Sequence, residues 1–242
     1  MDNAIEIKNL TKRYKDVTAV DDLTLSVGKG ELFALLGVNG AGKTTLAKML
    51  SCLILPTSGS AEVLGCDVIK EPEKVKEVIA ISPQETAVAK NLSVKENLEL
   101  MAGAHGFDKE KRKRKVNELI SEFGLEEVRD KYAGKLSGGW QRRLSIAMAL
   151  IGEPKVLFLD EPTLGLDVFA RRELWRIIES LKGKITVVLT THYMEEAEKL
   201  SDRLCIMKNG RIIAIGTANE MIEKTGTSSF DDAFVKIVEE NK

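Results

Sequence analysis

The chain has 242 residues, enough to bury a sizeable core as one large domain or two small ones. Its hydrophobic content of 43%, charged content of 30% and formal net charge of −1 are ordinary for a globular protein and argue against wholesale binding of nucleic acid or of an acidic membrane. No apolar run approaches the roughly 20 residues of a membrane span, and the polar start at residues 1–3 is unlike a secretory signal. We expect a soluble, cytoplasmic protein in which any membrane role goes through a partner.

The first third of the chain alternates between strand and helix patterns. Apolar and polar residues alternate over residues 5–7 and 23–27, which predicts antiparallel strands. The continuous apolar run of residues 31–36, ELFALL, predicts a buried strand, and residues 45–50, TLAKML, have the pattern of a helix start. A glycine-rich turn joins these last two elements.

That turn reads GVNGAGKTT over residues 37–45 and predicts a phosphate-binding loop. Its glycines let the backbone curl so that successive N–H groups point inward, and the new helix adds its positive N-terminal end. Lys43 supplies a mobile charge for the β- and γ-phosphates, and the Thr44 hydroxyl is a ligand for Mg²⁺. The alternative, a mere tight turn, does not require this strand and helix on its two sides. The predicted phosphate-binding residues are Gly37, Asn39, Gly40, Ala41, Gly42, Lys43, Thr44 and Thr45.

The rest of the chain continues the alternation, with one interruption. Strand patterns vanish between residues 93 and 133, where apolar residues fall at helical spacing. The remaining predicted elements are strands at 61–64, 78–81, 155–159 and 185–189, helices at 168–181 and 193–200, and a hairpin of 203–207 with 211–215 around Asn209-Gly210. We therefore predict an α/β fold with a mostly parallel sheet, helices on both of its faces, and an inserted helical block.

A second chemical feature follows the strand at 155–159. The strand delivers two adjacent carboxylates, Asp160 and Glu161, to its C-terminal end, where open α/β sheets bind ligands. In a phosphoryl-transfer site the first acid holds Mg²⁺ and the second polarises the attacking water. Taken alone, the pair reads as two ordinary acids at a strand end; the phosphate loop favours the chemical interpretation.

A third feature identifies the family that the chain resembles. Residues 136–141, LSGGWQ, stand just ahead of a helical pattern that continues to Ile151. Ser137 has the side chain of a helix cap, and Gly138 and Gly139 leave the first N–H groups of the helix bare for an anion. With the phosphate loop upstream and the acid pair downstream, the order of motifs over residues 4–216 resembles the ATPase subunit of ABC transporters.

The resemblance implies a P-loop NTPase core that binds ATP and Mg²⁺. It makes Glu161 the catalytic carboxylate, with His192 in contact with the γ-phosphate. It places Asp160 and Thr44 at the metal, and Gln84 at the metal or the lytic water, in a loop that also links the nucleotide site to a membrane partner.

Further residues receive roles in the same way. Tyr14 matches the aromatic residue that stacks on adenine, although an exposed tyrosine there would otherwise be unremarkable. Asp167 lies in the loop that crosses to a second subunit, and Ser137, Gly138 and Gly139 close on the ATP of that subunit. Trp140 stands where glutamine is the commoner choice in the family, at a position that varies within it.

The resemblance also implies an organisation into subdomains. Residues 1–84 and 153–216 would form the α/β core with an N-terminal antiparallel β subdomain. Residues 85–152 would form the helical subdomain, including the helix after LSGGWQ, and residues 217–242 a helical tail.

The expected function is to bind and hydrolyse ATP for a separately encoded membrane permease, at the inner face of the cell membrane. A second ATPase subunit, identical or different, would complete an ATP-dependent dimer, and no nucleic acid is expected as a partner. Residues 189–198 and 229–235 look like those of drug, lipid or polysaccharide exporters. The alternatives are an importer subunit, a non-transport ATPase of the same superfamily, or a module that binds nucleotide without turnover.

The basic run of residues 109–115, KEKRKRK, has a second interpretation as a nucleic-acid patch. Apolar residues continue it at helical spacing and no aromatic residues interleave with its charges. We therefore predict the solvated face of a helix.

Overall fold

The computed structural model describes residues 2–241, so Met1 and Lys242, which end two of the predicted ranges, lie outside the described residues. Its main sheet has six strands in the order β10-β9-β3-β8-β7-β6. The parallel strands are β3 (Leu32–Leu36), β6 (Ile79–Ser82), β7 (Val156–Asp160), β8 (Thr186–Thr191) and β9 (Arg203–Lys208). Only the edge strand β10 (Arg211–Gly216) is antiparallel within this sheet of the described chain. The predicted mostly parallel sheet is confirmed.

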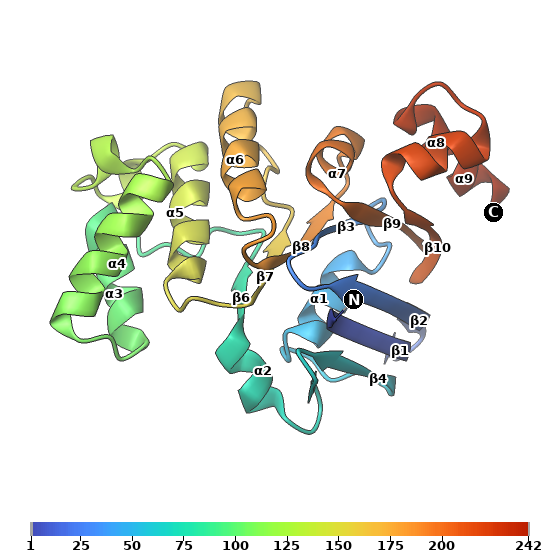
Figure 1. Ribbon diagram of the computed structural model, residues 1–242, viewed down its shortest axis with the longest axis horizontal. Coiled ribbons are helices and arrows are strands. Elements are labelled where there is room, and N and C mark those ends of the chain that lie inside the picture. Colours follow the sequence, from blue (N-terminus) through green and yellow to red (C-terminus); the bar gives the residue numbers. More distant parts are fainter. Residues whose placement is uncertain (1, 242) are drawn as a thin grey trace.

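A second sheet lies beside the first, at the lower right of Figure 1. It contains β1 (Asn3–Tyr14), β2 (Val17–Gly28), β4 (Ser58–Val63) and β5 (Cys66–Asp67) in the order β2-β1-β4-β5, and its pairs are antiparallel. The alternation of apolar and polar residues predicted β1 and β2, the strand predicted at residues 61–64 overlaps β4, and β5 was not predicted.

Successive residues of β3 face two different hydrophobic cores. Leu32, Ala34 and Leu36 belong to the core that contains α5 (Gly138–Leu150), α6 (Val168–Ser180) and α7 (Met194–Leu200). Phe33 and Leu35 belong to the core that contains α1 (Lys43–Leu50) and the antiparallel strands. Helices therefore cover both faces as predicted, but one face is shared with the second sheet.

The helical block stands apart from the antiparallel sheet, at the left of Figure 1. It contains α3 (Val94–Ala104), α4 (Lys109–Glu122) and two short 3₁₀ turns, Glu126–Val128 and Ala133–Lys135. A capping box between Ser93 and Glu96 starts α3, and the Asp108 carboxylate caps α4. Val116, Leu119 and Ile120 of α4 are buried while its basic N-terminal half is largely at the surface, which confirms the predicted solvated helix face.

Several element ends differ from the sequence prediction. The first helix begins at Lys43 rather than Thr45, so Lys43 and Thr44 lie in its first turn. Val78 ends a short helix, α2 (Pro72–Val78), that was not predicted, because seven residues carry too little periodicity. The chain closes with α8 (Ala218–Thr225) and α9 (Phe230–Glu240). None of the helices within residues 2–241 combines the length and apolar character that crossing a bilayer requires.

Candidate active site

The glycine-rich loop connects β3 to α1 and needs glycine at two positions for steric reasons. A Cβ atom at Gly37 would lie 2.5 Å from the carbonyl oxygen of Met207. At Gly42, where φ is +103°, it would lie 2.3 Å from the carbonyl oxygen of Ala19. Gly40 also has a positive φ, +82°, but among the described residues, its two chain neighbours apart, no atom lies within 4 Å of a Cβ built there. The first glycine of the loop, Gly37, therefore packs closely against β9, and Gly42 packs closely against β2, whereas Gly40 between them has free space around it.

The start of α1 is suited to bind an anion. Gly42 is its N-cap residue and no side chain within the described residues caps the helix, so its first backbone N–H groups remain available for a ligand. The Lys43 ammonium folds back over the loop and donates to the carbonyl oxygens of Gly37, at 2.7 Å, and Val38, at 3.2 Å.

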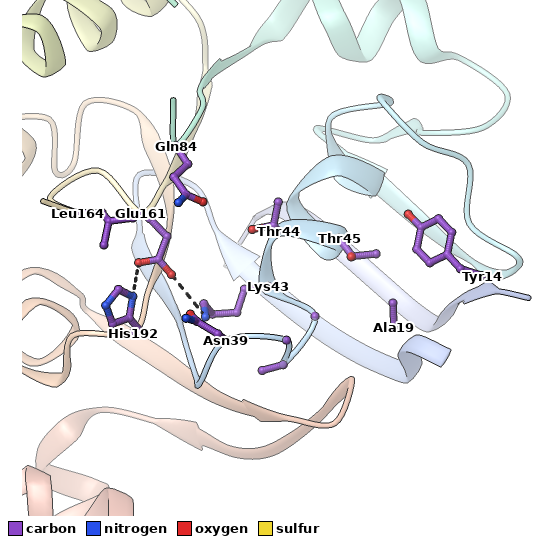
Figure 2. Close-up of a pocket in the computed structure, with 13 residues that line it drawn as sticks. Tyr14, Ala19, Asn39, Lys43, Thr44, Thr45, Gln84, Glu161, Leu164 and His192 are labelled. Carbon is purple, nitrogen blue, oxygen red and sulfur yellow. Dashed lines mark hydrogen bonds and ion pairs between the residues drawn. The ribbon is translucent and has the colours of Figure 1, made fainter. Parts of the chain in front are cut away.

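The Glu161 carboxylate lies between two nitrogen groups (Figure 2). Its Oε1 is 3.5 Å from Nζ of Lys43, and its Oε2 is 2.6 Å from Nδ1 of His192. These three residues follow the C-terminal ends of β3, β7 and β8, neighbouring strands of the parallel sheet. The sequence analysis assigned all three residues to the binding or hydrolysis of one ATP, and the structure brings them into contact.

The backbone of Glu161 is held in an unusual conformation. Its φ of +48° lies in the left-handed region that side-chain-bearing residues seldom adopt. Its N–H donates to the carbonyl oxygen of Thr190, at 3.0 Å, and lies 3.1 Å from the hydroxyl oxygen of the same residue. Thr190 thus fixes the direction in which the carboxylate leaves β7. Sequence reasoning missed Thr190 because a threonine inside an apolar strand gives no sign of its partner.

Asp160 is buried beside Glu161, and its Oδ1 accepts hydrogen bonds from two hydroxyl groups. Thr44 Oγ1 is 3.0 Å away and Thr190 Oγ1 is 2.5 Å away. A carboxylate beside a threonine hydroxyl matches the oxygen ligands that Mg²⁺ prefers. The described residues contain no cluster of three or more histidine, cysteine or acidic side chains placed to hold a metal. The Asp160 carboxylate and the Thr44 hydroxyl fit Mg²⁺, which commonly takes one or two carboxylates and completes its shell with water and phosphate oxygens.

Gln84 follows β6, and its backbone carbonyl oxygen accepts a hydrogen bond from α5. The guanidinium of Arg142, on α5, donates to the carbonyl oxygen of Pro83, at 2.6 Å, and to that of Gln84. Arg142 is only 4% exposed, and burial lowers the pKa of its guanidinium. Sequence reasoning also missed this arginine, whose only signal is a charged residue in a helix that becomes apolar two positions later.

The phosphate loop, Gln84, Glu161 and His192 line a cavity of about 570 Å³, within the size range of small-molecule sites. Figure 2 shows Tyr14 beyond Thr45, on the side of the cavity away from His192. Tyr14 is 45% exposed, so its ring is accessible to a ligand. The cavity is lined by Tyr14, Ala19, Asn39, Gly40, Ala41, Gly42, Lys43, Thr44, Thr45, Gln84, Glu161, Leu164 and His192.

A second set of predicted residues lies outside this cavity. Ser137 and Gly138 are exposed at the start of α5, next to the half-buried Gly139. Ser137 is the N-cap residue, but the expectation that its side chain caps α5 is wrong: its hydroxyl accepts no capping hydrogen bond from any described residue. Asp167 is exposed and caps α6 by accepting from the N–H groups of residues 169 and 170, which lowers the pKa of its carboxyl.

Trp140, the unusual residue of LSGGWQ, packs within α5. The guanidinium of Arg143 lies 4.6 Å from the centre of its indole ring and also pairs with the carboxylate of Glu173 on α6. The indole therefore rests on a cation, a favourable contact of roughly 0.5–1 kcal/mol at exposed sites.

Comparisons with known proteins agree with this geometry. A family model described as ABC transporter matches residues 20–164. The chain is 43% identical to the daunorubicin resistance ATP-binding protein DrrA3 of Streptomyces coeruleorubidus over 231 residues, which cover 95% of this chain and 73% of the relative. It is 41% identical to the doxorubicin resistance ATP-binding protein DrrA of Mycobacterium tuberculosis over 240 residues, covering 98% and 71%.

Two solved structures are similar over nearly their whole length. The ATP-binding subunit of an ABC transporter superposes with a TM-score of 0.85 at 31% identity, covering 97% of this chain and 99% of the other. The dimeric post-hydrolysis state of the ATP-binding cassette MJ0796, bound to ADP and Pi, superposes with a TM-score of 0.79 at 25% identity, covering 88% and 98%.

The contrast between Gly42 and Gly40 gives a matched test of the loop. We expect Gly42→Ala to destabilise the protein by about 2 kcal/mol or more, because strain at positive φ adds to a backbone clash. Gly40→Ala meets the strain alone and should cost about 1 kcal/mol. In thermal unfolding the first variant should lose about 4–8 °C and the second about half as much. Equal losses would show that the close approach to Ala19 does not constrain the loop.

Proposed function

The chain belongs to the ABC transporter family as an ATP-binding and ATP-hydrolysing subunit, and from that premise we propose that it powers export through a separate membrane permease. The observation that carries the enzymatic part is the Glu161 carboxylate held between Lys43 and His192 at the edge of a phosphate loop. The names of the drug-resistance relatives support export, and these relatives share most of their length with this chain. In such a system the subunit works at the cytoplasmic face of the membrane.

The residues divide the work of ATP binding. The loop N–H groups and the Lys43 ammonium bind the β- and γ-phosphates, and the Tyr14 ring stacks on adenine at the far side of the cavity. Thr44 and Asp160 would hold Mg²⁺, with Gln84 reaching it or the attacking water. When bound, this ion neutralises charge on the phosphate oxygens.

The residues at the opposite side of the cavity carry the chemical step. The Glu161 carboxylate orients a water molecule and accepts its proton as the water oxygen attacks the γ-phosphorus. The bond from that phosphorus to the β,γ-bridging oxygen breaks, and ADP leaves with the electron pair. His192, which lies 2.6 Å from Glu161, is placed to contact the γ-phosphate and to keep the carboxylate oriented.

The predicted site residues that lie outside the cavity are the ones expected to contact a second subunit. We infer that Ser137, Gly138 and Gly139 of one subunit close on the ATP held by another. Ser137 and Gly138 are exposed beside the half-buried Gly139 at the start of α5, and none of the three lines the cavity of its own chain. Asp167 would cross the same interface. ATP then stabilises the dimer, and hydrolysis releases it.

Glu161→Gln tests the role of the carboxylate. An amide keeps the shape of the side chain but does not accept a proton from water, so we expect ATP binding to persist while kcat falls by about 100-fold or more. Trapped ATP should then hold two subunits together, visible as a dimer in gel filtration with Mg-ATP. A variant that turns over ATP at the parental rate would remove Glu161 from the reaction.

Mixing two inactive variants tests the shared site. Ser137→Arg should block closure on the partner's ATP, and Lys43→Ala should abolish tight ATP binding by its own loop. Each alone should be inactive. In a head-to-tail dimer of the two, both lesions fall in one site and the other site is intact. With random pairing at equal amounts, about a quarter of the parental activity should return if the sites act independently.

If no ATPase activity returns on mixing, there are two explanations. Either both sites of a dimer must be intact for hydrolysis, or the site is not shared between subunits. Cysteines introduced at Asn39 and Gly139 separate them, because only a head-to-tail dimer brings these positions within disulfide distance. The half-buried native cysteines, Cys52 and Cys66, are replaced by serine in all proteins of this experiment. A disulfide between subunits in the presence of ATP supports cooperation, and its absence contradicts the shared site.

A further inference from the structure

Behind the catalytic edge lies a buried carboxyl group that the mechanism above does not use. Glu196, on α7, is 0% exposed. Its Oε1 accepts a hydrogen bond of 3.0 Å from Nε1 of Trp175 on α6. Its Oε2 is buried and has no hydrogen-bond partner among the described residues, and the same is true of the Thr163 hydroxyl. A buried, incompletely bonded carboxyl is costly, so its presence calls for a physical reason.

The neighbours of this carboxyl connect it to both catalytic residues. The hydroxyls of Thr163 and Thr191 lie beside it, and both threonines are fully buried. Thr163 follows Glu161 by two residues, and Thr191 directly precedes His192. Thr191 also bonds the segment after it, because its hydroxyl accepts from the N–H of Tyr193 at 3.0 Å. The carboxyl of Glu196 therefore sits where the Glu161 loop, the His192 segment and α6 meet.

We propose that Glu196 is a positioning residue for ATP hydrolysis, which holds the Glu161 loop and the His192 segment in register through Thr163, Thr191 and Trp175. The proposal rests on the roles proposed for Glu161 and His192. Its geometric basis is that Glu161 and His192 approach to 2.6 Å at the surface of the cavity, while Thr163, two residues after Glu161, and Thr191, directly before His192, lie beside one buried carboxyl.

The surroundings of Glu196 favour its neutral form. Burial raises the pKa of this carboxyl, and the negative charge of Glu161 raises it further, against the opposing effect of the three neighbouring hydrogen-bond donors. Lys199, on the same helix, lies over the Trp175 ring but pairs with Glu195 at 2.7 Å. A neutral acid accepts from Trp175 at one oxygen and donates from the other, which supplies a partner for the Thr163 hydroxyl oxygen.

Glutamine reproduces this pattern, because it has one acceptor and one donor in nearly the same shape. Methionine fills a similar volume but provides neither, and it leaves the Trp175 N–H buried without a partner. Glu195, the preceding residue, is exposed and pairs with Lys199, so Glu195→Gln is a matched control on the same helix.

The experiment measures kcat and KM for ATP in Glu196→Met, Glu196→Gln and Glu195→Gln, with thermal unfolding of each. We expect Glu196→Met to lower kcat by about 10- to 100-fold, because a small misplacement of reacting groups has effects of this size. KM should stay within about threefold, since Lys43 and the phosphate loop are not touched. Glu196→Gln should restore most of the kcat that Glu196→Met loses, and Glu195→Gln should match the parent.

Two outcomes would overturn the proposal. A folded Glu196→Met variant with parental kcat would show that the carboxyl has only a structural role. A Glu196→Gln variant as slow as Glu196→Met would show that hydrogen bonding by a neutral group is not what matters.

If Glu196→Met does not fold, Trp175→Phe decides the question, because it keeps the buried ring and removes only the indole donor. It should lower kcat without changing KM, and a parental kcat would contradict the proposal. The parent protein itself reports on the proposed function: a parent that does not hydrolyse ATP refutes that function, whereas an active parent beside an equally active Glu196→Met refutes this inference alone.

Discussion

The contact of the Glu161 carboxylate with Lys43 and His192 is the interaction on which the rest of the site depends. Three neighbouring parallel strands, β3, β7 and β8, end at one edge of the sheet and deliver these residues within hydrogen-bonding or ion-pair distance. In the proposed mechanism this position lets the carboxylate reach a water molecule next to the γ-phosphate, while Lys43 and His192 orient it from both sides. The left-handed backbone at Glu161, bonded to Thr190, is the local distortion that this placement requires.

In the proposed dimer, each chain supplies only part of the site that hydrolyses ATP. The cavity of one chain brings together the phosphate loop, Tyr14 and the Glu161 carboxylate, whereas Ser137 and Gly138 lie exposed outside it. Arg142 connects the start of α5 with the cavity of the same chain. It extends from α5, which begins at Gly138, and its guanidinium donates to the backbone carbonyl oxygens of Pro83 and Gln84. We propose that Arg142 thereby transmits closure of one subunit on another's ATP to Gln84, the residue expected to face the membrane partner.

The site residues that belong to short continuous motifs could be predicted from the sequence. GVNGAGKTT, Asp160-Glu161 and LSGGWQ each carry their meaning in a few consecutive residues between recognisable strands and helices, and their order implies the fold. Thr190, Arg142 and Glu196 could not be predicted in this way. Each acts through a partner distant in the sequence, and a threonine in a strand or a glutamate in a helix looks the same with or without that partner. The missing cap at Ser137 has the same origin, because cap residues are predicted from type and the hydroxyl orientation depends on its surroundings.

The central claim is that the ATPase site is assembled from two chains. It is tested most directly by the steady-state rate of ATP hydrolysis per chain, measured across a wide range of protein concentrations at saturating Mg-ATP. If two chains complete each site, turnover per chain rises with concentration and levels off once most chains are paired. Turnover per chain that is constant down to concentrations at which the protein is monomeric would show that one chain hydrolyses ATP by itself, and would contradict the account.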